Sequence, residues 1–82
     1  MTELRVPRVG DLVETVLIVE WLVEAGDRIS TGQPLVTVET DKVEVEVEAP
    51  HNGTVAEIVA HAETEIAVGA ILCRITPEQP ET

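Results

Sequence analysis

The sequence lacks phenylalanine and tyrosine, and Trp21 is its only aromatic residue. Proteins that bind single-stranded nucleic acid stack bases on several aromatic side chains, so this composition argues against that class. The charge balance agrees, because 16 acidic residues against five Lys and Arg give a net charge of −11, which repels phosphate backbones and anionic lipid surfaces. The sequence therefore predicts neither a nucleic-acid partner nor a membrane partner.

Cysteine and long apolar runs are equally scarce. Cys73 is the only cysteine, which excludes an internal disulfide and fits a reducing compartment. Met1 is followed by polar residues rather than by the apolar region of a signal peptide, and no stretch approaches the ~20 apolar residues of a transmembrane helix. We therefore expect a cytoplasmic location.

The residues that are abundant favour strands. Valine, isoleucine and threonine supply 29 of the 82 residues, and their stiff side chains suit a pleated surface, so the expected fold class is all-β. A chain of this length makes a single domain. Residues 77–82, rich in Pro and Glu, have little to bury. We expect one folded domain over residues 1–76, followed by a tail or the start of a linker.

An internal repeat appears when the sequence is laid on itself at an offset of 37 residues. Residues 16–38 then fall on residues 53–75 without a gap, and the identical pairs are Glu20/Glu57, Ala25/Ala62, Ile29/Ile66, Gly32/Gly69 and Leu35/Leu72. Two copies of this period are too few for a solenoid. The repeat predicts two interlocked β units related by a pseudo-twofold axis.

The clearest strand pattern runs through residues 35–49, where valines alternate with polar residues. A two-residue loop at Asp41 and Lys42 places Val38 opposite Val45, so that the valines of both strands share one face. The glutamates of the returning strand then form a solvated face rather than a calcium site: Glu44, Glu46 and Glu48.

Lys42 is the only lysine, and it lies at the expected tip of this hairpin. Its position alone would fit an ordinary surface lysine. A single amine at an apex, in a chain that uses acids elsewhere, instead suggests an attachment point. The repeat places Gln79 at the equivalent position, so the second half has no such tip. An amine held in water is not activated as a nucleophile, and we expect it to be modified rather than to catalyse.

The segment around this lysine resembles a known family. Glu39-Thr40-Asp41-Lys42-Val43, together with Gly26-Asp27, Gly32-Gln33-Pro34-Leu35, Ala49-Pro50 and Gly53, resembles the lipoyl domain of the acyltransferase component of 2-oxoacid dehydrogenase complexes. The resemblance covers about residues 3–76. It implies a flattened β-barrel of two four-stranded antiparallel sheets with internal pseudo-twofold symmetry, the modified lysine on one hairpin and the chain termini at the far end.

The resemblance also implies a function. Lys42 would carry lipoate as an amide, attached by a lipoate ligase or lipoyl transferase, and Asp41 and Val43 would present the lysine. The domain would be a non-catalytic carrier and, in isolation, a monomer. It would move acyl groups and electrons between a thiamine-diphosphate-dependent 2-oxoacid decarboxylase, a dihydrolipoyl acyltransferase core and dihydrolipoyl dehydrogenase. In this family a loop beside the lysine contributes to recognition by the decarboxylase. The resemblance implies that residues 10–16 form this loop here, with Gly10, Asp11 and Glu14 as its recognition residues.

Two positions depart from the family pattern. Thr15-Val16 stands where an acidic residue followed by glycine is common, which bears on partner choice. Glu63 stands where glycine is usual before the turn of the second half, so we expect a strained backbone angle there.

Two other functions remain open: a biotin carrier domain of a carboxylase, and an unmodified interaction module with the same fold. Biotinyl domains typically flank their lysine with methionines, which Asp41 and Val43 replace here. The remaining candidate residues are interpreted as structural. His51 and His61 lack metal-site spacing, Cys73 is expected in the core, and Trp21 is expected in the core with a partner for its N–H.

Overall fold

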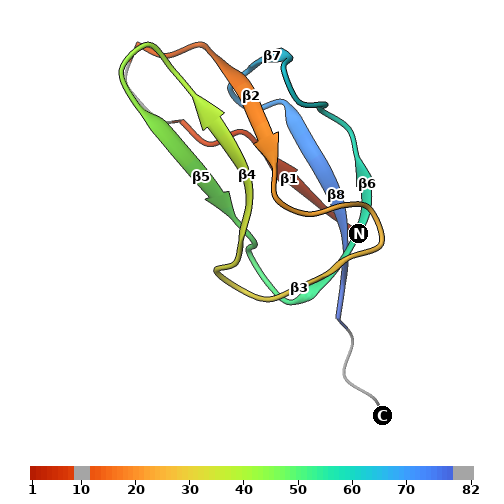
Figure 1. Cartoon of the computed structure of the whole chain (residues 1–82). Coiled ribbons are helices and arrows are strands. Elements are labelled where there is room, and N and C mark those ends of the chain that lie inside the picture. Colours follow the sequence, from red (N-terminus) through yellow and green to blue (C-terminus); the bar gives the residue numbers. More distant parts are fainter. Residues whose placement is uncertain (9–11, 79–82) are drawn as a thin grey trace.

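A computed structural model describes residues 1–8 and 12–78 of the chain (Figure 1). Regular structure in these residues consists of strands alone, which confirms the all-β prediction. They are β1 Thr2–Arg5, β2 Thr15–Trp21, β3 Arg28–Ile29, β4 Pro34–Glu39, β5 Glu44–Glu48, β6 Gly53–Ile58, β7 Glu65–Ala67 and β8 Ile71–Pro77. The described part of the chain contains no helix long and apolar enough to cross a membrane.

The strands form two antiparallel four-stranded sheets, in the orders β1-β8-β6-β3 and β5-β4-β2-β7. They pack around one core as a flattened barrel-sandwich, without closing into one continuous barrel (Figure 1). The 37-residue offset relates β2, β3 and β4 to β6, β7 and β8, so the order β4-β2-β7 in one sheet corresponds to the order β8-β6-β3 in the other. The two short strands are exchanged, since β3 pairs with β6 and β7 pairs with β2. Each half therefore completes the sheet of the other.

The symmetry extends to irregularities of the ladders. The register between β2 and β4 shifts between Ile18 and Glu20, and the register between β6 and β8 shifts between Val55 and Glu57. Each residue of the first bulge lies 37 positions before its counterpart in the second. The predicted pseudo-twofold repeat is thus a property of the backbone and not only of the sequence.

The core consists of aliphatic residues from both halves and the single cysteine. Four repeat pairs are almost completely buried, with exposed fractions of at most 1%: Ile18/Val55, Leu35/Leu72, Val36/Cys73 and Val38/Ile75. Trp21 differs from the prediction, because it is half-buried and packs against the edge of the core. Its Nε1–H donates to the carbonyl oxygen of Ala60 at 2.7 Å, so the expected partner is present.

The hairpin of β4 and β5 has the predicted register. Val38 pairs with Val45 and Val36 pairs with Val47, so Asp41 lies in the loop between the strands. The same ladder places Glu39 opposite Glu44 on the outer face. These pairings put the valines of the strands towards the core and the glutamates towards water.

Two side chains of this hairpin depart from the simple alternation. Val43 is 47% exposed, because it lies beyond the last paired residues, where no facing sheet covers it. Thr37 is buried although it lies on the polar face. It pairs with Glu46 on one side and Glu20 on the other, and the aliphatic parts of such long neighbours can shield a short side chain from water.

The predicted strain at Glu63 is confirmed. Its φ is 65°, while Gly26, the equivalent residue of the first half, has φ 97°. The Glu63 N–H donates to the Ile18 carbonyl at 2.6 Å, and the Gly26 N–H donates to the Val55 carbonyl at 2.7 Å. The same backbone bond thus holds both residues in the left-handed region, where only glycine avoids a steric penalty.

The end of the domain opposite the β4–β5 hairpin contains the N-terminus and the end of β8 (Figure 1). Here β8 continues to Pro77, and the Glu78 N–H donates to the Asn52 carbonyl at 3.0 Å. The Glu78 carboxylate also pairs with Arg28 at 3.0 Å. These contacts attach Pro77 and Glu78 to the folded strands, and residues 79–82 lie outside the described residues.

Candidate functional site

Lys42 lies at the tip of the β4–β5 hairpin, where the register of the two strands predicts it. Its side chain is exposed, and its ammonium has no hydrogen bond or ion pair with any residue the structure describes. Asp41, beside it, is also exposed. The tip thus presents one amine to solvent, accessible to an enzyme that approaches from outside.

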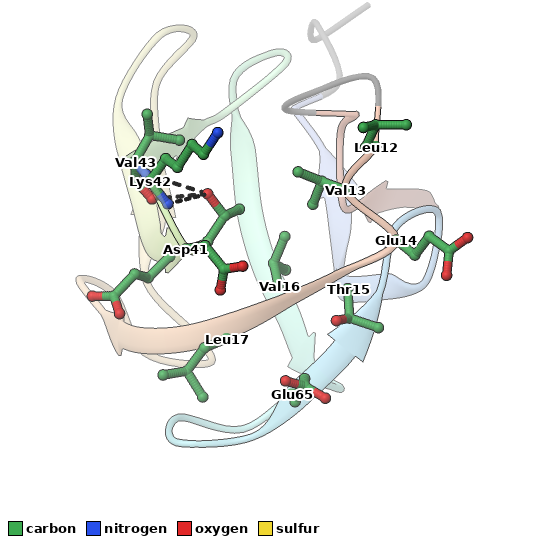
Figure 2. Close-up of a pocket in the computed structure, with 12 residues that line it drawn as sticks. Leu12, Val13, Glu14, Thr15, Val16, Leu17, Asp41, Lys42, Val43 and Glu65 are labelled. Atoms are coloured by element: carbon green, nitrogen blue, oxygen red, sulfur yellow. Dashed lines mark hydrogen bonds between the residues drawn. The ribbon is translucent and has the colours of Figure 1, made fainter.

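A threonine hydroxyl organises the backbone of this tip. The Thr40 N–H donates to the Val43 carbonyl at 2.8 Å and closes the turn. The N–H groups of Lys42 and Val43 both donate to Thr40 Oγ1, at 3.5 and 3.3 Å, and this hydroxyl donates to the Val43 carbonyl at 3.3 Å (Figure 2, dashed lines). The sequence interpretation assigned Thr40 no role. Threonine beside a tight turn is a known signal for this kind of bond, and it could have indicated the residue.

An open groove of about 1040 Å³ separates the hairpin tip from the segment that leads into β2. Lys42, Asp41 and Val43 line one side, and Val13 and Val16 face it from the other (Figure 2). The site therefore combines a free amine with a partly apolar surface beside it.

The predicted recognition loop forms part of this groove. Glu14 and Thr15 line it and are exposed, whereas Val16 is buried and anchors the segment to the core. The structure thus brings Glu14 to the same groove as the lysine. Gly10 and Asp11, the other two residues assigned to recognition, lie outside the described residues.

The electrostatic surroundings of the groove are acidic. The outer face of the sheet β5-β4-β2-β7 carries exposed glutamates that make no ion pair within the described residues: Glu20, Glu39, Glu44, Glu46, Glu48 and Glu65. The ion pairs between described strand residues lie on the other sheet. There Arg74 binds Glu57 at 2.6 Å and Glu3 at 3.6 Å, and the hydrogen bond that its guanidinium donates to Glu57 raises the pKa of Arg74.

The other candidate residues lie away from the groove. Cys73 is buried in the core, and burial raises the pKa of its thiol to about 11, so the reactive thiolate is scarce at neutral pH. His51 contacts Thr2 Oγ1 at 2.8 Å, and His61 is exposed. In the described ranges no three His, Cys, Asp or Glu side chains are grouped so that they could hold a metal ion.

The comparison with known proteins agrees with this geometry. Over residues 2–75 the chain matches the Biotin_lipoyl family, described as Biotin-requiring enzyme. It is 38% identical over 74 residues to the dihydrolipoyllysine-residue acetyltransferase component of the pyruvate dehydrogenase complex of Corynebacterium glutamicum, a match that covers 90% of this chain and 11% of that protein. It is 39% identical over 71 residues to the dihydrolipoyllysine-residue succinyltransferase component of the 2-oxoglutarate dehydrogenase complex of Bartonella vinsonii, covering 87% and 17%.

A solved structure is similar over almost the whole chain. The lipoyl domain of the 2-oxoglutarate dehydrogenase complex from Azotobacter vinelandii superimposes with a TM-score of 0.78 at 26% identity, covering 94% of this chain and 98% of that one. The curated relatives are much longer, and the chain spans less than a fifth of their length. The chain therefore belongs to the family of biotin and lipoyl attachment domains, as a non-catalytic carrier domain of the lipoyl type.

Proposed function

We propose that Lys42 carries lipoate in amide linkage and that the domain transfers acyl groups within a 2-oxoacid dehydrogenase complex. The observation that carries this proposal is the position of the only lysine. It is exposed at the tip of a tight hairpin, its ammonium is free within the described residues, and the segment around it resembles the lipoylation segment of the family.

Attachment joins Lys42 Nζ to the carboxyl carbon of lipoate. A lipoate ligase activates this carboxylate with ATP: a carboxylate oxygen attacks the α-phosphorus, pyrophosphate leaves, and lipoyl-AMP forms. The neutral amine then attacks the activated acyl carbon, the bond from that carbon to the phosphate oxygen breaks, AMP leaves, and the amine nitrogen releases a proton to solvent. Since Lys42 is exposed and no described side chain binds its ammonium, the contribution of this domain is the position of the amine.

Lipoate is favoured over biotin by two observations, although either group would be held by the same amide. The acyltransferase components of Corynebacterium glutamicum and Bartonella vinsonii, to which the chain is similar, are both named for a dihydrolipoyllysine residue. In this chain Asp41 and Val43 flank Lys42, where biotinyl domains typically place methionines.

The carrier role follows from the attached group and from its mounting. When bound, the dithiolane of lipoate accepts an acyl group with two electrons and later gives up both. The hairpin holds the attachment point at the end of the domain opposite the C-terminal end of β8 (Figure 1). A tether of this kind raises the effective concentration of the carried group at each active site. The partners we propose are a thiamine-diphosphate-dependent decarboxylase, a dihydrolipoyl acyltransferase core and dihydrolipoyl dehydrogenase.

The groove beside Lys42 is the surface we assign to recognition by the decarboxylase. Glu14 is exposed on its edge, and we include Gly10 and Asp11 from the sequence alone. The cognate decarboxylase should acylate the lipoylated domain far faster than free lipoamide, and Glu14→Ala should slow this reaction. Equal rates with the pyruvate, 2-oxoglutarate and branched-chain decarboxylases of the host, all unaffected by Glu14→Ala, would contradict the assignment.

Intact mass of the protein from its own host tests the attached group. A lipoyl increment on Lys42 supports the proposal. A biotinyl increment would instead indicate a carboxylase carrier, and an unmodified mass from a host that lipoylates its own proteins would indicate an interaction module.

Two variants test whether the position of the amine matters. Exchange of the loop residues, Asp41→Lys with Lys42→Asp, keeps composition and net charge, and both positions are exposed, so the fold should be unaffected. With lipoate ligase, ATP and lipoate, this variant should accept little or no lipoate, because its amine leaves the backbone one residue earlier. Lys42→Gln should stay folded and accept none. Efficient lipoylation of the exchanged variant would show that any exposed amine suffices.

A further inference from the structure

We infer that Thr40 is a positioning residue for the modification of Lys42. Its hydroxyl holds the hairpin tip in the arrangement from which an attaching enzyme takes the amine. This inference rests on the proposed lipoylation of Lys42, and it concerns a residue that touches the backbone of the lysine rather than its amine.

The turn at the hairpin tip is closed in an unusual way. In hairpins with two-residue loops, the two residues that flank the loop usually form two main-chain hydrogen bonds with each other. Among the described residues only one such bond is formed here, from the Thr40 N–H to the Val43 carbonyl at 2.8 Å. The Val43 N–H donates to Thr40 Oγ1 at 3.3 Å instead. A side chain therefore replaces part of the main-chain closure.

The same hydroxyl also binds the backbone of the lysine. The Lys42 N–H donates to Thr40 Oγ1 at 3.5 Å, and no other described residue accepts a bond from the N–H of Lys42 or Val43. The hydroxyl donates in turn to the Val43 carbonyl at 3.3 Å. Thr40 Oγ1 thus binds the backbone of both Lys42 and Val43.

The loop sequence makes this support necessary. Tight two-residue loops favour Asn-Gly or Asp-Gly, because glycine adopts the required backbone angles freely. The loop here is Asp41-Lys42, which lacks glycine, so its own conformational preference does not select one turn. Thr40 supplies local bonds that the loop residues cannot.

The conformation of the tip decides where the lysine side chain points. A ligase must bring the amine into line with the activated acyl carbon, and small displacements strongly reduce such reactions. If the hydroxyl is removed, water can solvate the exposed N–H groups of the tip, so the fold remains but the tip samples several conformations. The enzyme then acts only on the fraction of molecules with the competent conformation, and its apparent efficiency falls by that fraction.

Thr40 is suited to a test of this idea because it lies outside the paired strands. The last pair of the hairpin is Glu39 with Glu44, and the hydrogen bonds of the Thr40 side chain all remain within the tip. A change of its hydroxyl can therefore alter the tip without a change in the sheet.

The test compares Thr40→Val with the wild-type domain. Valine keeps the shape of threonine and removes the hydroxyl. We expect kcat/KM for lipoylation by lipoate ligase to fall about tenfold, by loss of the competent tip conformation. Thr40→Ser keeps the hydroxyl and should return the rate to within about twofold of wild type. Thr40→Ala removes the hydroxyl by a second route and should behave like the valine variant.

A matched control lies at the other end of the domain. The hydroxyl of Thr31 donates to Asn52 Oδ1 at 3.2 Å, so Thr31→Val removes a comparable bond far from the hairpin. This variant should be lipoylated at the wild-type rate. Melting temperatures of all variants show whether the fold is retained.

Two further measurements separate presentation of the amine, which means its position relative to the enzyme, from its availability, which means its exposure to any reagent. Acylation of Lys42 by a small N-hydroxysuccinimide ester needs an exposed amine but no defined geometry, so Thr40→Val should react at the wild-type rate. Amide hydrogen exchange at Lys42 and Val43 should become faster in Thr40→Val and remain unchanged in Thr31→Val, because only the first variant removes their acceptor.

The outcomes distinguish this inference from the proposed function. Lipoylation of folded Thr40→Val at the wild-type rate would overturn the role of Thr40 and leave the lipoyl carrier in place. An equal decrease in the ligase reaction and the ester reaction would also overturn it, since availability rather than presentation would then be the cause. If the wild-type domain itself accepts no lipoate, the proposed function fails, and this inference fails with it.

Discussion

Replacing Glu63 by glycine should stabilise the domain, because the structure holds a bulky residue where its symmetry mate is glycine. Glu63 has φ 65° and Gly26 has φ 97°, and both N–H groups make the equivalent backbone bond. Glu63 is exposed and forms no ion pair within the described residues, so its removal sacrifices no packing.

The magnitude follows from two opposing effects. A non-glycine residue in the left-handed region costs about 1–2 kcal/mol. Glycine loses about 0.5–1 kcal/mol more backbone entropy on folding than alanine does. The difference predicts that Glu63→Gly raises the free energy of unfolding by about 0.5–1 kcal/mol, which for a domain of this size raises the melting temperature by about 2–8 °C.

Two controls isolate the backbone effect. Glu63→Gln keeps the Cβ and removes the charge, so a rise in its melting temperature equal to that of Glu63→Gly would refute the reasoning in favour of charge repulsion. Gly26→Ala tests the same angle in the other half. A Cβ at Gly26 would meet no atom within 4 Å, so the expected net loss of about 0.5–1 kcal/mol is conformational alone. Differential scanning calorimetry of the three variants measures all of these changes.

Three further predictions concern the core and the charged face. Gly53→Ala should lower the free energy of unfolding by about 1–3 kcal/mol, because the added Cβ would collide with the carbonyl oxygen of Thr76; an unchanged urea midpoint would contradict this close approach. Burial raises the pKa of the Cys73 thiol from 9.0 to about 11, so the folded state binds the thiol proton more tightly than the unfolded state. The contribution of this thiol to the free energy of unfolding should therefore be fully present below pH 9 and be lost as the pH rises towards 11. Cys73→Ala should lack that part of the pH dependence in chemical denaturation. Salt should raise the melting temperature at neutral pH by screening Glu39 from Glu44, and Glu44→Gln should reduce the rise; a melting temperature insensitive to salt would argue against repulsion on this face.

Much of the fold could be predicted because its signals are local or repeated. The alternation around Asp41 and Lys42 determines which residues of β4 and β5 face each other, since a slip by one residue would bury the glutamates. The 37-residue repeat predicted the relation between the sheets. The family pattern places glycine at the position of Glu63, whose strain could therefore be anticipated.

The remaining features depend on contacts that a sequence does not display. The alternation predicts that Thr37 is an exposed polar residue, but the strands on its two sides, β5 and β2, bury it. Val13 and Val43 are far apart in the sequence but line the same groove. The role of Thr40 depends on bonds to the N–H groups of Lys42 and Val43, which form only once the turn has its shape.

The exchange of β3 and β7 between the two halves has a consequence for how this protein folds. Neither half can complete a four-stranded sheet alone, since Ile29 pairs with Gly53 and Val16 pairs with Ile66. A folding nucleus that includes these pairs must close long loops before it gains their stabilisation, which predicts refolding in milliseconds to seconds rather than microseconds. It also predicts one all-or-none transition, with no stage at which a single half is formed while the other remains unfolded.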